Sequence, residues 1–435
     1  AIENYYYPSD SLKVEPTYRY TKEIFDFLEK EIGVAYPWQN YKQVPVHDFL
    51  YAGMENTSAT FFSDAYVIDS TSFIDRNYVN INAHELAHQW FGNLVTEKNS
   101  EHHWLHEGFA TYYAYLAEKE VFGDDYFYWK LFETAKVLNE ASEKGEGQSL
   151  LDPKSSSLTF YEKGAWAIAI LRDEVGDINF KSGIKNYLNI YKFQNVTVAD
   201  FITVMEEASG KNLNKFKEVW LEGKEFPMEE VKDYLMTNSS SHKMYYVLKH
   251  DKQKTLITSD FLKDPELSTQ LKLEFLKRKG DIPELELSPL IVSDNINIRQ
   301  YAAQKMGEIP EILKEFAETL LLDNSYITNE LMLYNLWSSF DYDRRVFLDK
   351  TKAIIGLPNK NVRLLWLTLA LVTPDYNPEA STEYYEELIG YTNPIFNPEV
   401  RQTAFHYLFE IQAIKGDGLV NLIKATNHHS WQFRN

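Results

Sequence analysis

Two histidines and a glutamate with the spacing of a hydrolytic metal site stand in the first quarter of the chain. His84 and His88 flank Glu85 in the pattern His-Glu-Leu-Ala-His. Positions i and i+4 of a helix lie on one face, so both imidazoles can hold one cation while Glu85 lies beside it. The pattern therefore predicts a zinc ion that activates water, with Glu85 taking the proton of that water.

Glu107 is the predicted third zinc ligand, because it follows His88 by nineteen residues and opens a second helical pattern. Three protein ligands leave one position of a tetrahedral zinc ion for water. The chain has no cysteine, so histidine and carboxylate must supply all the ligands. His102, His103 and His106 lie nearby, but their spacing fits no second metal site, and we leave them out of the ligand set.

Helices are predicted to position these groups. Apolar periodicity places helices at about 78–92 and 107–122, with Gly92 and Gly123 as C-terminal stops. Further helical patterns cover residues 21–32, 160–175, 181–190, 199–208 and 212–222.

A β-strand is predicted before the first of the two ligand helices. Residues 42–51 alternate loosely between polar and apolar side chains and lead into residues 52–56. This pattern predicts an edge strand next to the site.

Four motifs in order resemble those of the aminopeptidase N-like zinc metallopeptidases, a family that includes the bifunctional leukotriene hydrolases. They are Ala-Gly-Met-Glu-Asn at 52–56, the His-Glu-x-x-His pattern, Glu107, and Tyr-Glu-Lys-Gly at 161–164. The match is specific over about residues 20–225 and weaker beyond them.

The resemblance implies a thermolysin-like catalytic domain and a role for each motif. His84, His88 and Glu107 would bind zinc, Glu85 would act on the water, and Tyr161 would donate to the developing oxyanion. The backbone at Ala52, Gly53 and Met54 would line the substrate, and Glu55 would pair with its free α-amino group. A carboxylate at that place favours cleavage at the N-terminus over cleavage inside a peptide.

Several positions depart from the family pattern. Ala52 replaces the first glycine of its motif, and Ala114 stands where many relatives carry an acid near the zinc site. Lys154 and Ser155 follow the Asp-Pro pair where leukotriene hydrolases carry an acid, so epoxide hydrolysis is not expected. The N-terminal β domain of the family is expected to be missing, and the chain to be part of a longer protein.

Composition limits the class of protein. The 435 residues predict two or three domains, and 44% hydrophobic and 25% charged residues are typical of a folded protein. A net charge of −20 argues against nucleic-acid and anionic-membrane partners. No apolar run reaches the length of a membrane span. The compartment, cytoplasmic or exported, and the oligomeric state are left open.

The C-terminal part of the chain has a repeating pattern. Three-residue segments with a polar first residue, an apolar second residue and a final arginine open apolar-periodic helices near 297–299, 361–363, 399–401 and 432–434, and 328–330 fills the gap. Steps of 30 to 38 residues are typical of stacked helix pairs, so an irregular HEAT/armadillo-like array is predicted. An ordinary helical bundle with chance spacing is the alternative.

The sequence as a whole predicts a mainly α protein with a small β region. Residues 1–228 would form the thermolysin-like zinc peptidase domain, 229–264 a connecting segment and 265–435 the helical-repeat domain. The predicted function is a zinc aminopeptidase acting on peptides with a free N-terminus. An endopeptidase is one alternative, and a peptide-binding or scaffold fragment with an incomplete zinc site is another.

Overall fold

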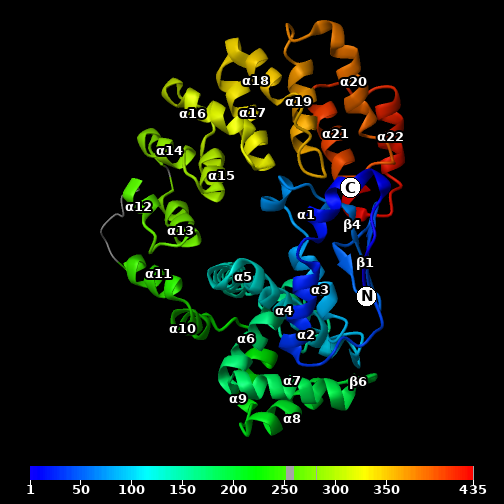
Figure 1. The fold of residues 1–435 in the computed structure, drawn as a ribbon, viewed down its shortest axis with the longest axis vertical. Coiled ribbons are helices and arrows are strands. Elements are labelled where there is room, and N and C mark those ends of the chain that lie inside the picture. Colours follow the sequence, from blue (N-terminus) through cyan, green and yellow to red (C-terminus); the bar gives the residue numbers. More distant parts are fainter. Residues whose placement is uncertain (251–258, 281, 435) are drawn as a thin grey trace.

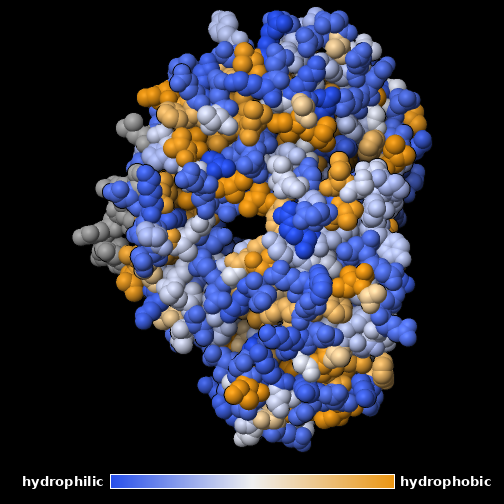
Figure 2. Space-filling view, viewed as in Figure 1, coloured by the Kyte–Doolittle hydropathy of each residue, from blue (hydrophilic) through white to orange (hydrophobic). Residues whose placement is uncertain are grey.

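Helices dominate the structure, a computed structural model that describes residues 1–250, 259–280 and 282–434. This confirms the predicted fold class of mainly α with few strands. The later helices leave the helices of the first half on one side and curve back to the β-sheet on the other (Figure 1). An opening remains near the middle of the face shown in Figure 2.

The main sheet has four strands in the order β1-β2-β4-β3. The strands are β1 (Ile2–Asn4), β2 (Tyr41–Val46), β3 (Gly53–Met54) and β4 (Ala59–Ser63). β2 pairs in parallel with β1 and β4, whereas β3 pairs with β4 in the antiparallel direction. A separate parallel pair joins β5 (Val95–Glu97) to β6 (Gln194–Val196).

An edge strand does lie next to the site, but it is β3, within residues 52–56. Residues 42–51 are not at the edge, because β2 lies inside the sheet, whose edge strands are β1 and β3. Pro45 had indicated an edge because proline cannot donate to a strand ladder. The pairing of β1 with β2 covers only residues 41–43, so Pro45 lies beyond the end of β1. The missing amide proton therefore breaks no pairing with β1.

α-Helices form most of the first half of the chain. They are α1 (Val14–Tyr18), α2 (Thr21–Ile32), α3 (Val79–Ala87), α4 (Trp104–Phe122), α5 (Asp124–Glu143), α6 (Gly164–Val175), α7 (Asp177–Tyr191), α8 (Val198–Ser209), α9 (Asn214–Phe216), α10 (Met228–Asn238) and α11 (Ser240–His250). Two π-helices, η5 (Leu158–Lys163) and η6 (Lys217–Glu222), lie among them.

Short 3-10 helices connect many of the longer elements. They are η1 (Pro8–Lys13), η2 (Asp64–Tyr66), η3 (Ser72–Ile74), η4 (Ser100–His102), η7 (Glu311–Leu313), η8 (Leu320–Leu322), η9 (Asp341–Asp343) and η10 (Pro378–Ala380).

The first apolar core surrounds α4, which is buried on nearly all sides. Trp90, Trp104 and Trp166 are fully buried within this core. The predicted helix at 21–32 is confirmed as α2, whose apolar stripe packs on the same core. The two predicted ligand helices are present as α3 and α4, although α3 ends before the predicted stop at Gly92.

The later helices enclose a second apolar core that draws on residues from Phe261 to Leu408. They are α12 (Ser259–Lys263), α13 (Thr269–Lys279), α14 (Glu284–Ile291), α15 (Ile296–Lys305), α16 (Lys314–Thr319), α17 (Tyr326–Ser339), α18 (Arg344–Thr351), α19 (Asn361–Leu371), α20 (Ser381–Gly390), α21 (Pro398–Glu410), α22 (Asp417–Ala425) and α23 (Trp431–Arg434). None of the helices described is long and apolar enough to cross a membrane.

The segment that leads into α3 is attached to these later helices through Asp75. The carboxylate of Asp75 accepts hydrogen bonds from the backbone N–H groups of Tyr326 and Ile327, at 2.7 and 3.3 Å. It also accepts from Ser325 Oγ and Gln300 Nε2, both at 2.8 Å. Asp75 therefore caps the N-terminus of α17 from another part of the chain.

Two more contacts join the same segment to α21. Asn397 Nδ2 donates to Asp64 Oδ1 at 2.8 Å, and Arg76 Nη1 lies 2.9 Å from Glu399 Oε2. Both partners lie at the start of α21. The entry to the helix that carries His84 and His88 is thus held against two helices of the second core.

Candidate active site

Three predicted ligand atoms converge at the spacing of a metal site. The His84 and His88 Nε2 atoms lie 3.1 Å apart, and Glu107 Oε2 lies 3.2 Å from the first and 3.3 Å from the second. Zinc bonds of about 2 Å in a tetrahedron separate neighbouring ligand atoms by roughly 3.3 Å. The donor set therefore has the size that zinc needs.

The hydrogen bonding of the His88 ring also suits a metal ligand. Its Nδ1 donates to the carbonyl oxygen of Phe91 at 2.9 Å, which leaves the lone pair of Nε2 for a cation. Burial alone would lower the pKa of His88, but the Glu107 carboxylate outweighs burial and raises that pKa to about 10. Burial likewise opposes ionisation of Glu107, yet the two histidines hold its pKa well below the ordinary value. The cluster thus favours a positive charge at its centre.

Glu85 lies beside the cluster with one carboxylate oxygen, Oε2, buried and without a hydrogen-bond partner. Burial raises the pKa of Glu85 to about 8. A Cβ atom on Gly53 would stand 2.3 Å from Glu85 Oε1, so only glycine leaves room for this carboxylate. An unpartnered buried carboxylate oxygen costs free energy unless a ligand or water meets it.

Tyr161 lies over the cluster from the π-helix η5. Its ring stacks on the ring of His84 with centroids 5.5 Å apart. Burial raises the pKa of Tyr161, so the hydroxyl keeps its proton. Gly108 and Gly164 meet backbone to backbone, because a Cβ on Gly108 would lie 3.0 Å from Gly164 Cα. This crossing brings η5 close to α4.

Glu55 follows the edge strand β3 on the other side of the cluster. One oxygen of Glu55, one of Glu85 and one nitrogen of His88 lie within 4.8 Å of one another. The backbone carbonyl of Glu55 accepts from Asn93 Nδ2 at 2.7 Å, which anchors the end of β3. The side of β3 away from β4 pairs with no described strand.

All the predicted site residues line one cavity of about 560 Å³. They are Ala52, Gly53, Met54, Glu55, His84, Glu85, His88, Glu107 and Tyr161. The structure therefore brings together residues that are more than 100 positions apart in the sequence.

Further residues of the same cavity were missed in the sequence. Asn80 and Ile81 lie one turn before His84 on α3, and Thr111 lies one turn after Glu107 on α4. Helical periodicity could have found these three. Lys130 comes from α5, and no sequence pattern connects it to the site.

Two of the remaining histidines near α4, His103 and His106, contact Glu97 at the end of β5. His106 Nε2 accepts from the backbone N–H of Glu97 at 2.7 Å, so its proton sits on Nδ1, which faces the Glu97 carboxylate. His103 Nδ1 lies 3.1 Å from the same carboxylate. Ligand atoms of Glu97, His103 and His106 lie within 4.8 Å of one another, as a group separate from the predicted ligand set.

A group of one aspartate and two histidines joins the C-terminal segment to the loop before β3. His428 Nε2 lies 2.9 Å from Asp48 Oδ2, and His429 Nδ1 lies 3.7 Å from the same atom. The backbone N–H of Ser430 donates to His428 Nδ1, so the proton of His428 points at Asp48. This group is a hydrogen-bonded contact rather than a metal site.

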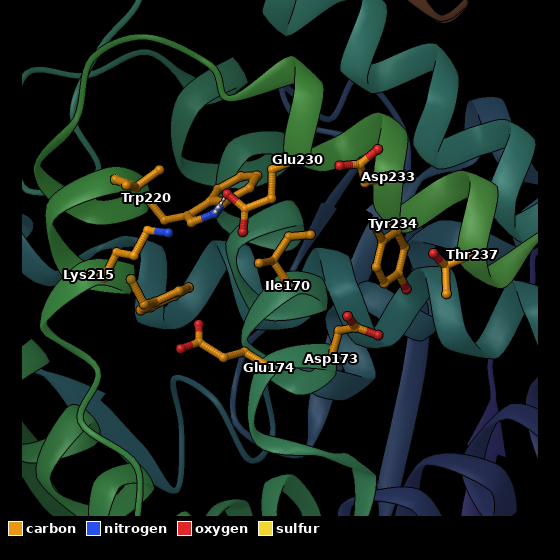
Figure 3. A pocket seen from close by; sticks show the side chains of 11 residues that line it. Ile170, Asp173, Glu174, Lys215, Trp220, Glu230, Asp233, Tyr234 and Thr237 are labelled. Atoms are coloured by element: carbon orange, nitrogen blue, oxygen red, sulfur yellow. Dashed lines mark hydrogen bonds between the residues drawn. The ribbon is translucent and has the colours of Figure 1, made fainter. Parts of the chain in front are cut away.

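A second cavity, of about 300 Å³, lies between α6, η6 and α10 (Figure 3). Four acids surround it, Asp173, Glu174, Glu230 and Asp233, and Trp220 Nε1 donates to Glu230 at 3.3 Å. Its lining contains no histidine and none of the predicted site residues. This cavity therefore lacks the histidine ligands of the site described above.

Comparison with known proteins decides the family. Residues 17–220 match the Peptidase family M1 domain. This part of the chain belongs to peptidase family M1. The resemblance to the aminopeptidase N-like metallopeptidases is thereby confirmed, and the matched region contains every motif on which it was based.

Aminopeptidases are among the relatives of this chain. It is 27% identical over 394 residues to probable aminopeptidase 2 of Sulfurisphaera tokodaii, covering 77% of this chain and 47% of that protein. It is 30% identical over 228 residues to leucyl aminopeptidase of Saccharolobus solfataricus, covering 48% and 28%. The chain spans less than half the length of these curated relatives.

A solved structure shares the fold over most of this chain. The structure of yeast LTA4 hydrolase in complex with bestatin matches with a TM-score of 0.54 and 18% sequence identity, over 95% of this chain and 60% of the other. At this identity the likeness concerns the fold, including the later helices.

Proposed function

We propose that this chain is the catalytic part of a zinc aminopeptidase that removes N-terminal residues from peptides. The observation that carries the proposal is the convergence of His84, His88 and Glu107 at tetrahedral spacing, beside an unpartnered Glu85 carboxylate. Aminopeptidases among the relatives support the same function.

His84, His88 and Glu107 would hold the zinc ion. A bound zinc ion supplies Lewis-acid activation of water and of the scissile carbonyl group. Glu85 takes the proton of the attacking water and delivers it to the leaving amine. Tyr161 keeps its proton and donates a hydrogen bond to the carbonyl oxygen as negative charge develops there.

Glu55 and strand β3 would bind the substrate. The Glu55 carboxylate, close to Glu85 and His88, pairs with the α-ammonium group of a free N-terminus. The open side of β3 offers the backbone of Gly53 and Met54 to an extended peptide, and Ala52 continues this edge. An internal peptide segment leaves the Glu55 carboxylate unpaired, which disfavours endopeptidase cleavage.

We also propose a thermolysin-like catalytic domain over 1–228, a connecting segment over 229–264 and a HEAT-like repeat domain over 265–435. The two apolar cores support this division, although α10 and α11 pack on the first core. A recurring ion pair supports the repeat. Arg299 pairs with Asp323 and Arg363 with Glu387, in each case 24 residues onward.

The test of this function is Glu85→Gln, assayed on an aminoacyl amide together with the zinc content. The variant should lose nearly all turnover while it keeps zinc, because the amide cannot take the proton of water. Glu140→Gln changes an exposed glutamate on α5 and should leave turnover unchanged. Undiminished turnover by Glu85→Gln would contradict the mechanism.

A second substrate separates the proposal from its alternatives. The same peptide with a blocked N-terminus should not be cleaved, because Glu55 then has no cation to bind. Cleavage of the blocked peptide would favour an endopeptidase. Stoichiometric zinc without turnover of either substrate would favour a peptide-binding fragment.

A further inference from the structure

The π-helix that carries Tyr161 is an unusual support for a reacting group. π-Helices are rare, occur mostly as single turns inside α-helices and are enriched at functional sites. η5 spans Leu158–Lys163 directly before α6, so Tyr161 stands in its middle. A conformation of this kind persists only where surrounding contacts hold it.

Gln148 supplies such contacts at the N-terminal end of η5. It lies in the connection between α5 and η5 and belongs to none of the family motifs. Its side-chain Oε1 accepts from the backbone N–H of Ser156 at 2.8 Å and from Thr159 Oγ1 at 3.0 Å. One oxygen atom thus fixes both Ser156, two residues before the helix, and Thr159, its second residue.

The backbone of Gln148 holds the other end of η5. Lys163 Nζ, at the last position of the helix, donates to the carbonyl oxygen of Gln148 at 2.8 Å and to that of Gly223 at 2.6 Å. Lys163 is 2% exposed, and burial lowers its pKa to about 8. A buried ammonium group depends on such acceptors, so Lys163 is held firmly where these two carbonyls meet.

We propose that Gln148 is a positioning residue that fixes the Tyr161 hydroxyl group over the zinc-ligand cluster by fastening both ends of η5. The proposal rests on the proposed role of Tyr161 in hydrolysis. Gln148 is not among the residues that line the cavity, so in this proposal it acts through the position of Tyr161.

A double-mutant cycle on the intact chain tests this coupling. Tyr161→Phe should lower kcat by about 100-fold, as for loss of one oxyanion donor. Gln148→Leu should lower kcat by about tenfold with KM little changed, because a displaced donor stabilises the transition state less. In the Tyr161→Phe background, Gln148→Leu should have almost no further effect, since the hydroxyl it positions is gone.

Conservative and control variants separate positioning from a general loss of structure. Gln148→Glu keeps an acceptor oxygen and should restore most of the activity. Thr159→Val removes one of the two side-chain contacts and should lower kcat by about threefold. Gln194→Leu changes an exposed glutamine that bonds a helix carbonyl away from the cavity and should have no effect.

Hydrogen exchange gives a readout that does not depend on catalysis. The peptide covering residues 156–164 should exchange faster in Gln148→Leu, while peptides from α3 remain protected and the zinc content is unchanged. Wild-type kcat in Gln148→Leu would overturn the proposal, and so would an equal tenfold loss in the Tyr161→Phe background. An unchanged kcat in Tyr161→Phe alone would instead refute the assigned role of Tyr161.

Discussion

Replacement of Asp75 by alanine should loosen the attachment of the later helices to the segment that enters α3. Asp75 accepts four hydrogen bonds, two of them from the first N–H groups of α17. In Asp75→Ala these two N–H groups lose their hydrogen-bond partner. They lie at the N-terminus of α17, where the first half of the chain contacts the second half.

The expected loss is about 2–3 kcal/mol of unfolding free energy. Loss of a helix N-cap costs roughly 0.5–2 kcal/mol, and a hydrogen bond to a charged group contributes roughly 1.5–3 kcal/mol. Burial, which raises the pKa of Asp75, offsets part of that gain. Ser325 Oγ still caps the N–H of Thr328 in the variant, which keeps the loss below the sum of all four bonds. Asp75→Asn retains one acceptor oxygen and should lose about half as much.

Urea unfolding followed by tryptophan fluorescence measures this loss, because both cores contain buried tryptophans. Asp26→Ala, which breaks an exposed ion pair on α2, serves as the control and should change stability by less than about 0.5 kcal/mol. A loss below about 0.5 kcal/mol in Asp75→Ala would refute the view that this carboxylate holds the two halves together.

Two further predictions concern the cavity. Gly53→Ala should displace the Glu85 carboxylate, lower kcat while zinc is retained and cost about 1–3 kcal/mol of stability, whereas Gly390→Ala, with open space around it, should not destabilise the chain. Normal kcat in Gly53→Ala would mean that the carboxylate does not need this space. Removal of zinc by a chelator should lower the melting temperature, because a ligand at about 1,000 times its Kd stabilises by roughly 4 kcal/mol. The His88→Ala variant should show no such shift, and an equal shift would place the metal elsewhere.

The chemistry of the site was predictable from the sequence because it depends on residues close together on helices. His84 and His88 share a helix face through the fixed 3.6-residue repeat, and Glu107 opens the next predicted helix. Glu55 and Tyr161 could be assigned only through the family resemblance, because each alone is an ordinary residue of its type. The structure brings all five to one cavity.

The edge of the sheet was not predictable from the local pattern. Alternation and Pro45 indicated an edge strand, whereas strand order depends on which distant strands pair with β2. The later helices were found where the repeat placed them, because each opens with its own local pattern. Their attachment through Asp75 could not be predicted from the sequence, since the four hydrogen-bond partners of Asp75 lie at least 225 residues away.

Local spacing along the sequence was enough to indicate a metal hydrolase and the helices that carry its ligands. Helical geometry places residues of a given spacing on one face of a helix. Tertiary structure alone decided how the reacting groups are held. The room that Gly53 leaves for Glu85 and the crossing of Gly108 with Gly164 are contacts between segments distant in sequence. The contacts of Gln148 with η5 span 8 to 15 residues and cross an irregular connection rather than a helical repeat. Such contacts follow from packing in three dimensions, which no periodicity encodes.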